Sequence, residues 1–315
     1  NVKMGNLKKI KGEASFKKFL RKKKKNLNSI IVISKKEKKK NLLIYDAINK
    51  ILIKNKILAP NLYQESYKKN YVEIEDFGDE TFFKILKNKN NKFFYFKKVI
   101  NILSQIQRIK TRKIKNFKNQ IYNVPEYSQK ILISEANLFC DWYVKNNLSK
   151  KKRIRFIKKF KETVKDLISN LKLKNEVFVH RDFHVSNLML VNKKIGIIDS
   201  QDALIGNKAY DLASLIDDVR LKTSKLLKNR IYNSFIKKQK KLDKFKFKND
   251  FDILSVLRNL KIIGIFTRLA MRDNKKKYLK LIPYSWELIS MRIQKNEIFK
   301  DLKNLLIQNF KKKIK

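Results

Sequence analysis

Residues 179–199 read VHRDFHVSNLMLVNKKIGIID, and this stretch does most to decide the fold. A hydrophobic run ends at Val179 and is followed by HRD, which places Asp182 just beyond a predicted strand. Asn187 comes five positions after Asp182, so both side chains can belong to one loop. The tripeptide alone is a weak signal in so charged a chain. Together with the asparagine spacing and the preceding strand, it makes coincidence a poor explanation.

A short hairpin is predicted directly after Asn187. The apolar segments 188–191 and 195–198 are separated by a polar turn of Asn and Lys, which is the pattern of two antiparallel strands. Asp199 follows the second segment. Because a hairpin returns the chain to its starting point, we expect Asp199 to lie near Asn187.

These three polar residues suit phosphoryl transfer from Mg-ATP. Such a reaction needs a carboxylate that orients the attacking hydroxyl and takes its proton, oxygen ligands that hold Mg2+, and positive charge around the transferred group. Asp182 fits the base. Asn187 and Asp199 fit the sparse oxygen ligation of Mg2+, whose shell phosphates and waters would complete. We therefore predict a catalytic centre that uses ATP and Mg2+.

The two histidines, His180 and His184, are four positions apart, which on a helix would place both on one face. Here they fall in a loop with no cysteine or third ligand nearby in the sequence. A structural imidazole at His180, packed under the loop, is therefore favoured over a zinc site. For His184, a contact with phosphate and a contact with backbone both stay open.

The composition describes a globular and strongly basic chain. Its 315 residues include 78 Lys+Arg against 28 Asp+Glu, a formal charge of +50, and 43% hydrophobic residues. Basic surfaces bind nucleic-acid backbones. The lysines here are spread along the whole chain, however, and accompany abundant Asn and Ile with few Gly and Pro, as AT-rich coding produces. We expect no specific nucleic-acid partner and only weak binding to polyanions.

Signals for export and membrane insertion are not seen. The N-terminal NVKMGNLKKIKGEAS lacks the apolar centre of a secretory signal, and apolar stretches such as 262–266 are too short to span a membrane. The single cysteine, Cys140, excludes an internal disulfide and suits a reducing compartment. We expect a cytoplasmic monomer without membrane contact.

The order of the predicted elements suggests two lobes. Residues 7–35 read as short strands and 71–75 as another, whereas the chain beyond Gly78 is mostly helical. We predict a small, β-rich N-terminal lobe for the nucleotide, residues 1–75, and a larger helical lobe for catalysis and substrate, residues 76–315. Helices are expected near 38–54, 91–110, 128–147, 151–173, 208–240, 251–272 and 293–312.

HRDFHVSNLML followed by IGIIDSQDALIGNKAYDLASLIDDVR resembles the aminoglycoside phosphotransferase superfamily. Within it, the segment is most similar to the anomeric N-acetylmuramate/N-acetylglucosamine kinases of bacterial cell-wall recycling. Further blocks resemble that family in the same order: GEASFKKFLR (12–21), VEIEDFGD (72–79), SEANLFCDWY (134–143) and GIFTRLAMRDNKKKYLKLIP (264–283). The resemblance implies an α+β, protein-kinase-like two-lobed fold. It also implies transfer of a phosphate from ATP to the anomeric hydroxyl of an amino sugar.

The resemblance also implies roles for individual residues. Asp182 would be the catalytic base, and Asn187 and Asp199 would hold Mg2+. Asp211 would brace the catalytic loop. The lysine that pairs with ATP is hard to identify among so many, and Lys35 is the candidate. The residues implied to contact ATP are Gly12, Glu13, Ala14 and Ser15 at the phosphates, and Glu73, Ile74 and Glu75, continuing to Asp76, at the adenine.

The remaining implied contacts are with the sugar. Glu135, Phe139 and Trp142 lie at i, i+4 and i+7 on one face of a predicted helix, where a carboxylate could take hydroxyls and an aromatic ring could support the sugar. Arg268 and Arg272 could meet an anionic group such as a lactyl carboxylate. For Glu135, Phe139 and Trp142, a core-facing aromatic stripe stays open as the alternative. For Arg268 and Arg272, ordinary ion pairs stay open as the alternative.

Departures from the family pattern keep other functions open. Ser200 stands where the family usually has Phe, which changes the packing beside Asp199 more than the chemistry. The turn at Gly12 has one glycine where protein kinases have three. A degenerate pseudokinase is an alternative, although the intact Asp182, Asn187 and Asp199 argue against it. Two further alternative functions stay open. One is a kinase of an aminoglycoside, choline, homoserine or similar hydroxyl compound, and the other is a non-catalytic basic binding protein.

Overall fold

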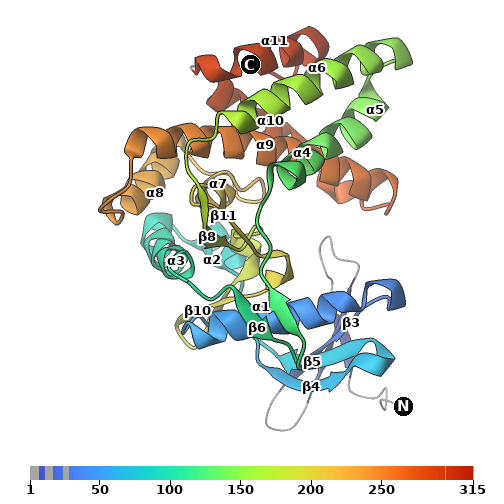
Figure 1. Cartoon of the computed structure of the whole chain (residues 1–315), viewed down its shortest axis with the longest axis vertical. Coiled ribbons are helices and arrows are strands. Elements are labelled where there is room, and N and C mark those ends of the chain that lie inside the picture. Colours follow the sequence, from blue (N-terminus) through green and yellow to red (C-terminus); the bar gives the residue numbers. More distant parts are fainter. Residues whose placement is uncertain (1–6, 11–16, 24–27, 295, 315) are drawn as a thin grey trace. The chain divides into compact units, whose positions relative to one another are not determined.

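The computed structural model describes residues 7–10, 17–23, 28–294 and 296–314. They divide into two compact units (Figure 1). The first unit holds the described residues up to Pro125 together with His180–Leu204, and the second holds Glu126–Val179 and the described residues from Ile205 onward. The predicted boundary between lobes after residue 75 stays a prediction.

The first unit is built on an antiparallel sheet of five strands in the order β1-β2-β3-β5-β4. Helix α1 lies along one face of this sheet (Figure 1). Because side chains alternate along a strand, Ile30, Val32, Val72 and Ile74 all face α1 and form a core cluster with Leu42 and Tyr45. The elements are β1 (Leu7–Ile10), β2 (Lys18–Lys22), β3 (Ser29–Ile33), α1 (Lys40–Lys54), β4 (Leu62–Ser66) and β5 (Tyr71–Glu75).

The rest of the first unit carries the predicted hairpin. Strands β9 (Leu188–Val191) and β10 (Lys194–Ile197) pair in antiparallel register, and the turn between them puts Asn192 and Lys193 at positive φ. An isolated bridge pairs Leu58 with Gly196 of this hairpin. The other elements are α2 (Phe82–Asn88), α3 (Lys92–Ile106), β6 (Lys113–Lys115) and β7 (Ile121–Asn123).

The second unit is mainly helical. An aromatic cluster around the buried Phe139 joins its helices through the rings of Tyr143, Phe156, Phe160, Trp286 and Phe310. Gly264 lets α9 approach Leu138 closely, because a Cβ at Gly264 would lie 2.3 Å from the Leu138 carbonyl. The elements are α4 (Gln129–Leu138), a π-helical turn (Phe139–Val144), α5 (Lys145–Asn147), α6 (Lys150–Ser169), β8 (Asn175–Val179), β11 (Leu204–Asn207), α7 (Tyr210–Ile216), α8 (Lys225–Lys237), α9 (Lys244–Met271), α10 (Ile282–Ile293) and α11 (Lys300–Phe310).

The predicted α+β, kinase-like fold class is confirmed, because an antiparallel five-stranded sheet is combined with a helical unit. The single helix predicted for 208–240 is wrong, since the chain leaves helical geometry between Ile216 and Lys225. Among the described residues, no helix has the length and apolar content needed to cross a bilayer.

The break after Ile216 has a physical reason in Asp217. Its fully buried carboxylate lies 3.1 Å from Lys228 Nζ and 2.9 Å from the Arg292 guanidinium, and it accepts a hydrogen bond from Ser255 Oγ at 2.6 Å. Burial opposes the charge, but Arg292, Lys228 and these hydrogen bonds outweigh it and lower the pKa of Asp217 to about 2. A buried carboxylate with such partners anchors α8, α9 and α10 to one turn.

We predict that Asp217→Asn lowers the free energy of unfolding by about 2–3 kcal/mol, because Lys228 and Arg292 lose their counter-charge. Thermal or urea unfolding measures the change, with the exposed Asp166→Asn as the matched control. The depressed pKa means that the Asp217 contribution is complete above its ordinary pKa of 3.8 and is lost as pH falls towards 2. The two proteins should therefore converge in stability at low pH, and a gap that persists there would contradict this assignment.

Candidate active site

The loop that carries Asp182 is held by its own backbone and by Asn187. The Asp182 carbonyl accepts hydrogen bonds from His184 N and from Asn187 Nδ2, both at 3.0 Å. Asn187 N donates to the His184 carbonyl at 2.9 Å and closes the turn. The predicted proximity of Asp182 and Asn187 is thus found, because a side-chain amide bridges the loop.

His180 is a buried support for this loop. Its ring is fully buried, packs edge-on against Phe183 at 6.2 Å, and places Nε2 3.2 Å from the Ile198 carbonyl. The His184 Nε2 lies 3.4 Å from Asn187 Nδ2. Within the described ranges, no three His, Cys, Asp or Glu side chains gather as metal ligands. The structural interpretation of His180 fits this packing.

The hairpin brings Asp199 back to Asn187, as its length predicts. Leu188 and Ile197 are paired in register, and Ile198 N donates to the Asn187 carbonyl at 3.1 Å. Gly196 makes the return possible, because a Cβ there would lie 2.6 Å from the buried Phe77 ring. Asp199 itself has φ +61°, a left-handed conformation that aspartate tolerates better than most side chains.

The carboxylate of Asp199 sits among other charges. Burial raises its pKa, and the nearby carboxylates of Asp182 and Asp202 raise it further, while Lys17 acts in the opposite direction. The side chain keeps 37% of its surface exposed. The carboxylates of Asp182 and Asp202 disfavour the ionised form of Asp199. A cation bound at the exposed edge of Asp199 would relieve this repulsion.

Lys17 is the residue that sequence reasoning missed. It is 5% exposed, and its Nζ donates to Gln201 Oε1 at 2.7 Å, lies 3.9 Å from Asp199 Oδ1 and sits 5.0 Å above the Tyr45 ring. Burial lowers the pKa of Lys17, which Asp199 and Asp202 partly oppose. Lys35, the sequence candidate, is instead exposed at the start of a 3-10 turn after β3.

Lys17 reaches the site from the position directly before β2. It lies two positions before Phe19, whose side chain packs against the core cluster on the α1 face of the sheet. The described β3 strand carries no lysine, and its residues on that face, Ile30 and Val32, are apolar. The block GEASFKKFLR contains this lysine immediately before Lys18, the first residue of β2.

Ser200, the departure from the family pattern, makes a specific contact. It is fully buried and donates a hydrogen bond from Oγ to Asn49 Oδ1 of α1 at 2.5 Å. Asn49 in turn donates from Nδ2 to the Pro60 carbonyl at 3.1 Å. The residue next to Asp199 is thus tied to α1 by a hydrogen bond that phenylalanine could not form.

The structure describes only some of the predicted nucleotide residues. Gly12, Glu13, Ala14 and Ser15 lie outside the described residues. Glu73, Ile74 and Glu75 belong to β5, whose neighbours are β3 and β4. The Glu73 side chain is buried, accepts a hydrogen bond from Ser29 Oγ at 2.6 Å and pairs with Lys22 at 3.2 Å. β5 is flanked on both sides by paired strands, and the chain leaves this sheet after Glu75.

That following segment is fastened to β2 by Arg21. The Arg21 guanidinium contacts Asp76 through Nε at 2.5 Å and Asp79 through Nη1 at 2.7 Å, and it donates to the Gly78 carbonyl at 3.1 Å. These carboxylates outweigh partial burial and raise the pKa of Arg21. The Arg21 guanidinium, with several N–H donors in a fixed plane, therefore fixes the conformation of the connection after β5.

The predicted sugar residues belong to the second unit. Glu135 is buried, pairs with Lys261 at 2.7 Å and accepts a short hydrogen bond from Tyr127. Phe139 lies fully inside the aromatic cluster, so the core alternative describes it. Phe139 and Trp142 both belong to the π-helical turn, and Trp142 is half-buried.

The two arginines differ in their surroundings. Arg272 is exposed and pairs with Asp273 at 2.8 Å, as the ion-pair alternative expects. Arg268, one turn earlier on α9, is half-buried, and burial lowers its pKa. Asp211 is fully buried on α7.

The donor set suits a metal that binds nucleotide phosphates. Asp199 offers a partly exposed carboxylate, and Asn187 offers an amide oxygen, because its nitrogen is already used by the Asp182 carbonyl. Oxygen ligands of this kind, too few to enclose an ion, match Mg2+ better than a transition metal.

A family model described as the phosphotransferase enzyme family matches residues 7–232. The chain belongs to this family. The resemblance expected from the sequence is thereby confirmed, and the protein is an enzyme, an ATP-dependent phosphotransferase that acts on a hydroxyl group.

Curated relatives and solved structures are similar over most of the chain. An N-acetylmuramate/N-acetylglucosamine kinase of Neisseria meningitidis serogroup B is 26% identical over 86% of this chain and 80% of its own. A kinase of the same name from Pseudomonas aeruginosa is 26% identical over 79% and 72%. The solved aminoglycoside phosphotransferase APH(2'')-Ib, ADP-bound, has a TM-score of 0.61 at 14% identity and covers 91% of this chain and 95% of that one, which supports the fold.

We predict that Gly196→Ala destabilises the first unit by about 1–3 kcal/mol, because the added methyl must displace the buried Phe77 ring. Urea unfolding measures the cost. Lys194→Ala, an exposed change on the same strand, is the matched control and should alter stability far less. Equal stability of the two variants would mean that the close approach at Gly196 is not needed to return Asp199.

Proposed function

We propose that the enzyme transfers the γ-phosphoryl group of Mg-ATP to the anomeric hydroxyl of N-acetylmuramate or N-acetylglucosamine. The observation that carries the proposal is the loop joining Asp182 to Asn187, with Asp199 returned beside it and Lys17 buried against Asp199. The substrate class rests on the names of the curated relatives and on their coverage of the chain. Because ATP is a cytosolic cosubstrate, we also propose that the enzyme works in the cytoplasm. We propose a monomer as its working state.

The proposed chemistry follows from the side chains. The Asp182 carboxylate accepts a hydrogen bond from the anomeric hydroxyl and so orients the hydroxyl oxygen towards the γ-phosphorus. The carboxylate takes the hydroxyl proton as the new oxygen–phosphorus bond forms. The bond to the β,γ-bridging oxygen breaks, and ADP leaves. Asn187 and Asp199 would hold Mg2+, which when bound would neutralise phosphate charge.

Lys17 takes the role that the sequence assigned to Lys35. Its ammonium is already beside Asp199, and the Gln201 hydrogen bond and the Tyr45 ring hold it in place. A buried cation at this point would bind the phosphates of the nucleotide with little reorganisation. Among the residues that the structure describes, none supports the exposed Lys35 in a comparable way.

Asp182→Asn should lower kcat for both amino sugars by about 10²–10⁴-fold, because the hydroxyl loses its proton acceptor. A coupled assay of ADP release measures the rate, with the exposed Asp301→Asn as the control. A near wild-type rate for Asp182→Asn on every sugar tested would rule out this mechanism.

Lys17→Met should lower kcat/KM for ATP by about 10²–10³-fold, since a methionine fills the space but supplies no charge to the phosphates. Lys35→Met is the matched control and should keep the wild-type value. A large loss of kcat/KM for ATP in Lys35→Met, with a wild-type value in Lys17→Met, would show that Lys35 is the lysine that binds ATP.

A further inference from the structure

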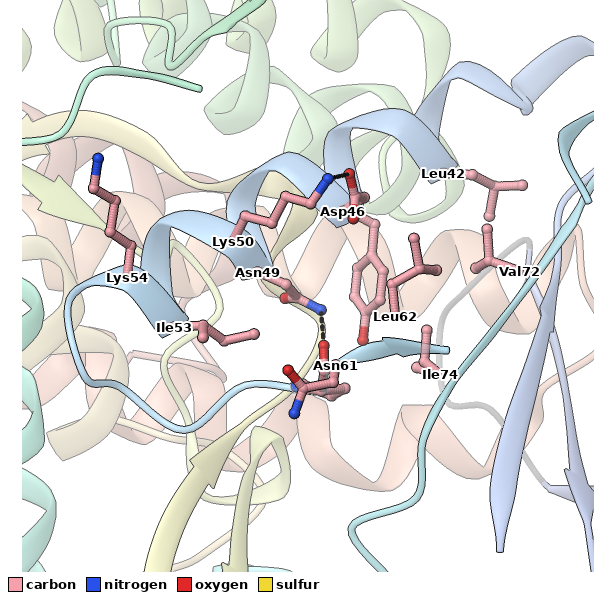
Figure 2. A pocket seen from close by; sticks show the side chains of 12 residues that line it. Leu42, Asp46, Asn49, Lys50, Ile53, Lys54, Asn61, Leu62, Val72 and Ile74 are labelled. Carbon is pink, nitrogen blue, oxygen red and sulfur yellow. Dashed lines mark hydrogen bonds and ion pairs between the residues drawn. The ribbon is translucent and has the colours of Figure 1, made fainter. Parts of the chain in front are cut away.

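One large aromatic side chain of the second unit lies in water. Elsewhere large apolar side chains are packed, as between α1 and strands β4 and β5 (Figure 2), where Leu42, Val72 and Ile74 are at most 5% exposed. Phe245, in the first turn of α9, is 84% exposed, more than any other large hydrophobic side chain that the structure describes. A single exposed apolar residue is common on protein surfaces, so the surroundings of Phe245 decide what it can bind.

The position of Phe245 is fixed by the start of α9. Asp243 caps this helix, because its carboxylate accepts hydrogen bonds from the backbone N–H groups of Phe245 and Lys246, both at 3.0 Å. Two residues after Phe245, Phe247 is fully buried and packs against Phe235 of α8, with ring centroids 5.5 Å apart. The end of α8 and the start of α9 are thus held together, and the turn between them presents the Phe245 ring to solvent.

Lysines lie on both sides of Phe245 in the sequence. Residues 237–248 read KKQKKLDKFKFK and contain seven lysines in twelve positions, more than twice the density expected from 78 Lys+Arg in 315 residues. Coding bias along the whole chain does not account for such a local excess. The only acid of this stretch is Asp243, which pairs with Lys246 at 3.6 Å.

Most of these lysines keep an unneutralised charge. Lys248 pairs with Asp252 of the same helix. Five others are exposed, and their side chains form no ion pair or hydrogen bond with any residue that the structure describes: Lys237, Lys238, Lys240, Lys241 and Lys244. Residues 237–246, named here the α8–α9 tip, therefore combine an exposed ring with five unpaired ammonium groups.

This combination fits the surface of an anionic lipid bilayer. Each lysine near such a surface strengthens binding about fivefold, through attraction to lipid phosphates. An aromatic ring gains further when it leaves water for the boundary between headgroups and acyl chains. Long lysine stems let the ammonium groups stay in the headgroup layer while the ring lies deeper.

A nucleic acid is the other polyanion that lysines attract. Proteins that hold a single strand use a charged groove in which bases stack on aromatic rings. Because the Phe245 ring is 84% exposed, no neighbouring side chain forms a wall over it. A bilayer surface needs no such wall, so the exposure of the ring favours lipid.

We propose that the α8–α9 tip binds the surface of an anionic lipid bilayer, with the Phe245 ring at the acyl boundary and the five lysines at the lipid phosphates. The inference goes beyond the proposed function and replaces the expectation of no membrane contact. Binding of this kind is peripheral and needs no spanning helix. It is compatible with the proposed cytoplasmic location, because the bound leaflet can face the cytoplasm.

Co-sedimentation of the full chain with vesicles made of equal parts of phosphatidylglycerol and phosphatidylcholine tests the role of the ring. Wild type should bind these vesicles and not vesicles of phosphatidylcholine alone. Phe245→Ser should weaken binding about tenfold, because its side chain gains little by leaving water. Leu226→Ser, which removes a 71% exposed side chain at the other end of α8, is the matched control and should bind as wild type.

A charge-reversal pair tests the role of the lysines. The double variant Lys241→Glu/Lys244→Glu should weaken vesicle binding at least about 25-fold, since two attractive charges become repulsive. The double variant Lys151→Glu/Lys158→Glu, on exposed positions of α6, changes the net charge equally. It should weaken binding less than about threefold, because salt screens charges that lie far from the bilayer.

Three results would overturn the proposal: no binding of wild type to the anionic vesicles, equal binding of wild type and Phe245→Ser, or equal losses in the two double variants. A Phe245→Ser protein that binds vesicles as wild type but polyuridylate about tenfold more weakly would identify a nucleic-acid surface instead. All the substituted side chains are exposed, so each variant should unfold at the wild-type temperature. Vesicle binding requires no kinase activity, so its outcome is independent of the proposed function.

Discussion

The buried ammonium of Lys17 beside the Asp199 carboxylate is the interaction on which the rest of the site depends. Removing a lysine from water is costly unless its charge is matched, and here Asp199, the Gln201 hydrogen bond and the Tyr45 ring share that task. In return, Lys17 relieves the repulsion that Asp199 experiences from Asp182 and Asp202. The pair gathers the charges that phosphoryl transfer requires, and each partner would be unfavourable at its position without the other.

This pairing constrains the surrounding elements. Lys17 reaches Asp199 only if β2 presents the face that also carries Phe19, and Asp199 returns to the loop only if Gly196 allows β10 to approach Phe77. Helix α1 supports both charges, through Tyr45 under Lys17 and through Asn49 on Ser200. The serine in place of the family's phenylalanine thus exchanges a packing contact for a hydrogen bond, and it makes α1 part of the site.

Local patterns were predictable and long-range pairings were not. The spacing of Asp182, Asn187 and Asp199 depends on one loop and one hairpin, so the sequence alone was sufficient to place them together. Lys17 was missed because its burial depends on α1 and on Gln201, which are distant in the sequence. The helix predicted across Asp217 failed for a similar reason, since two of the partners of Asp217, Ser255 and Arg292, are distant in the sequence. Periodicity could not separate a core aromatic at Phe139 from a sugar platform, because both require an apolar helix face.

The central claim is that phosphate is transferred to the anomeric oxygen. The most direct measurement follows ADP release and the reducing end of the sugar together, with N-acetylmuramate or N-acetylglucosamine as the acceptor. A phosphate on the anomeric oxygen prevents ring opening and removes the reducing end, whereas a phosphate on any other hydroxyl leaves it intact. The account predicts that one reducing end is lost for each ADP formed. ADP formation with the reducing ends fully retained would contradict it.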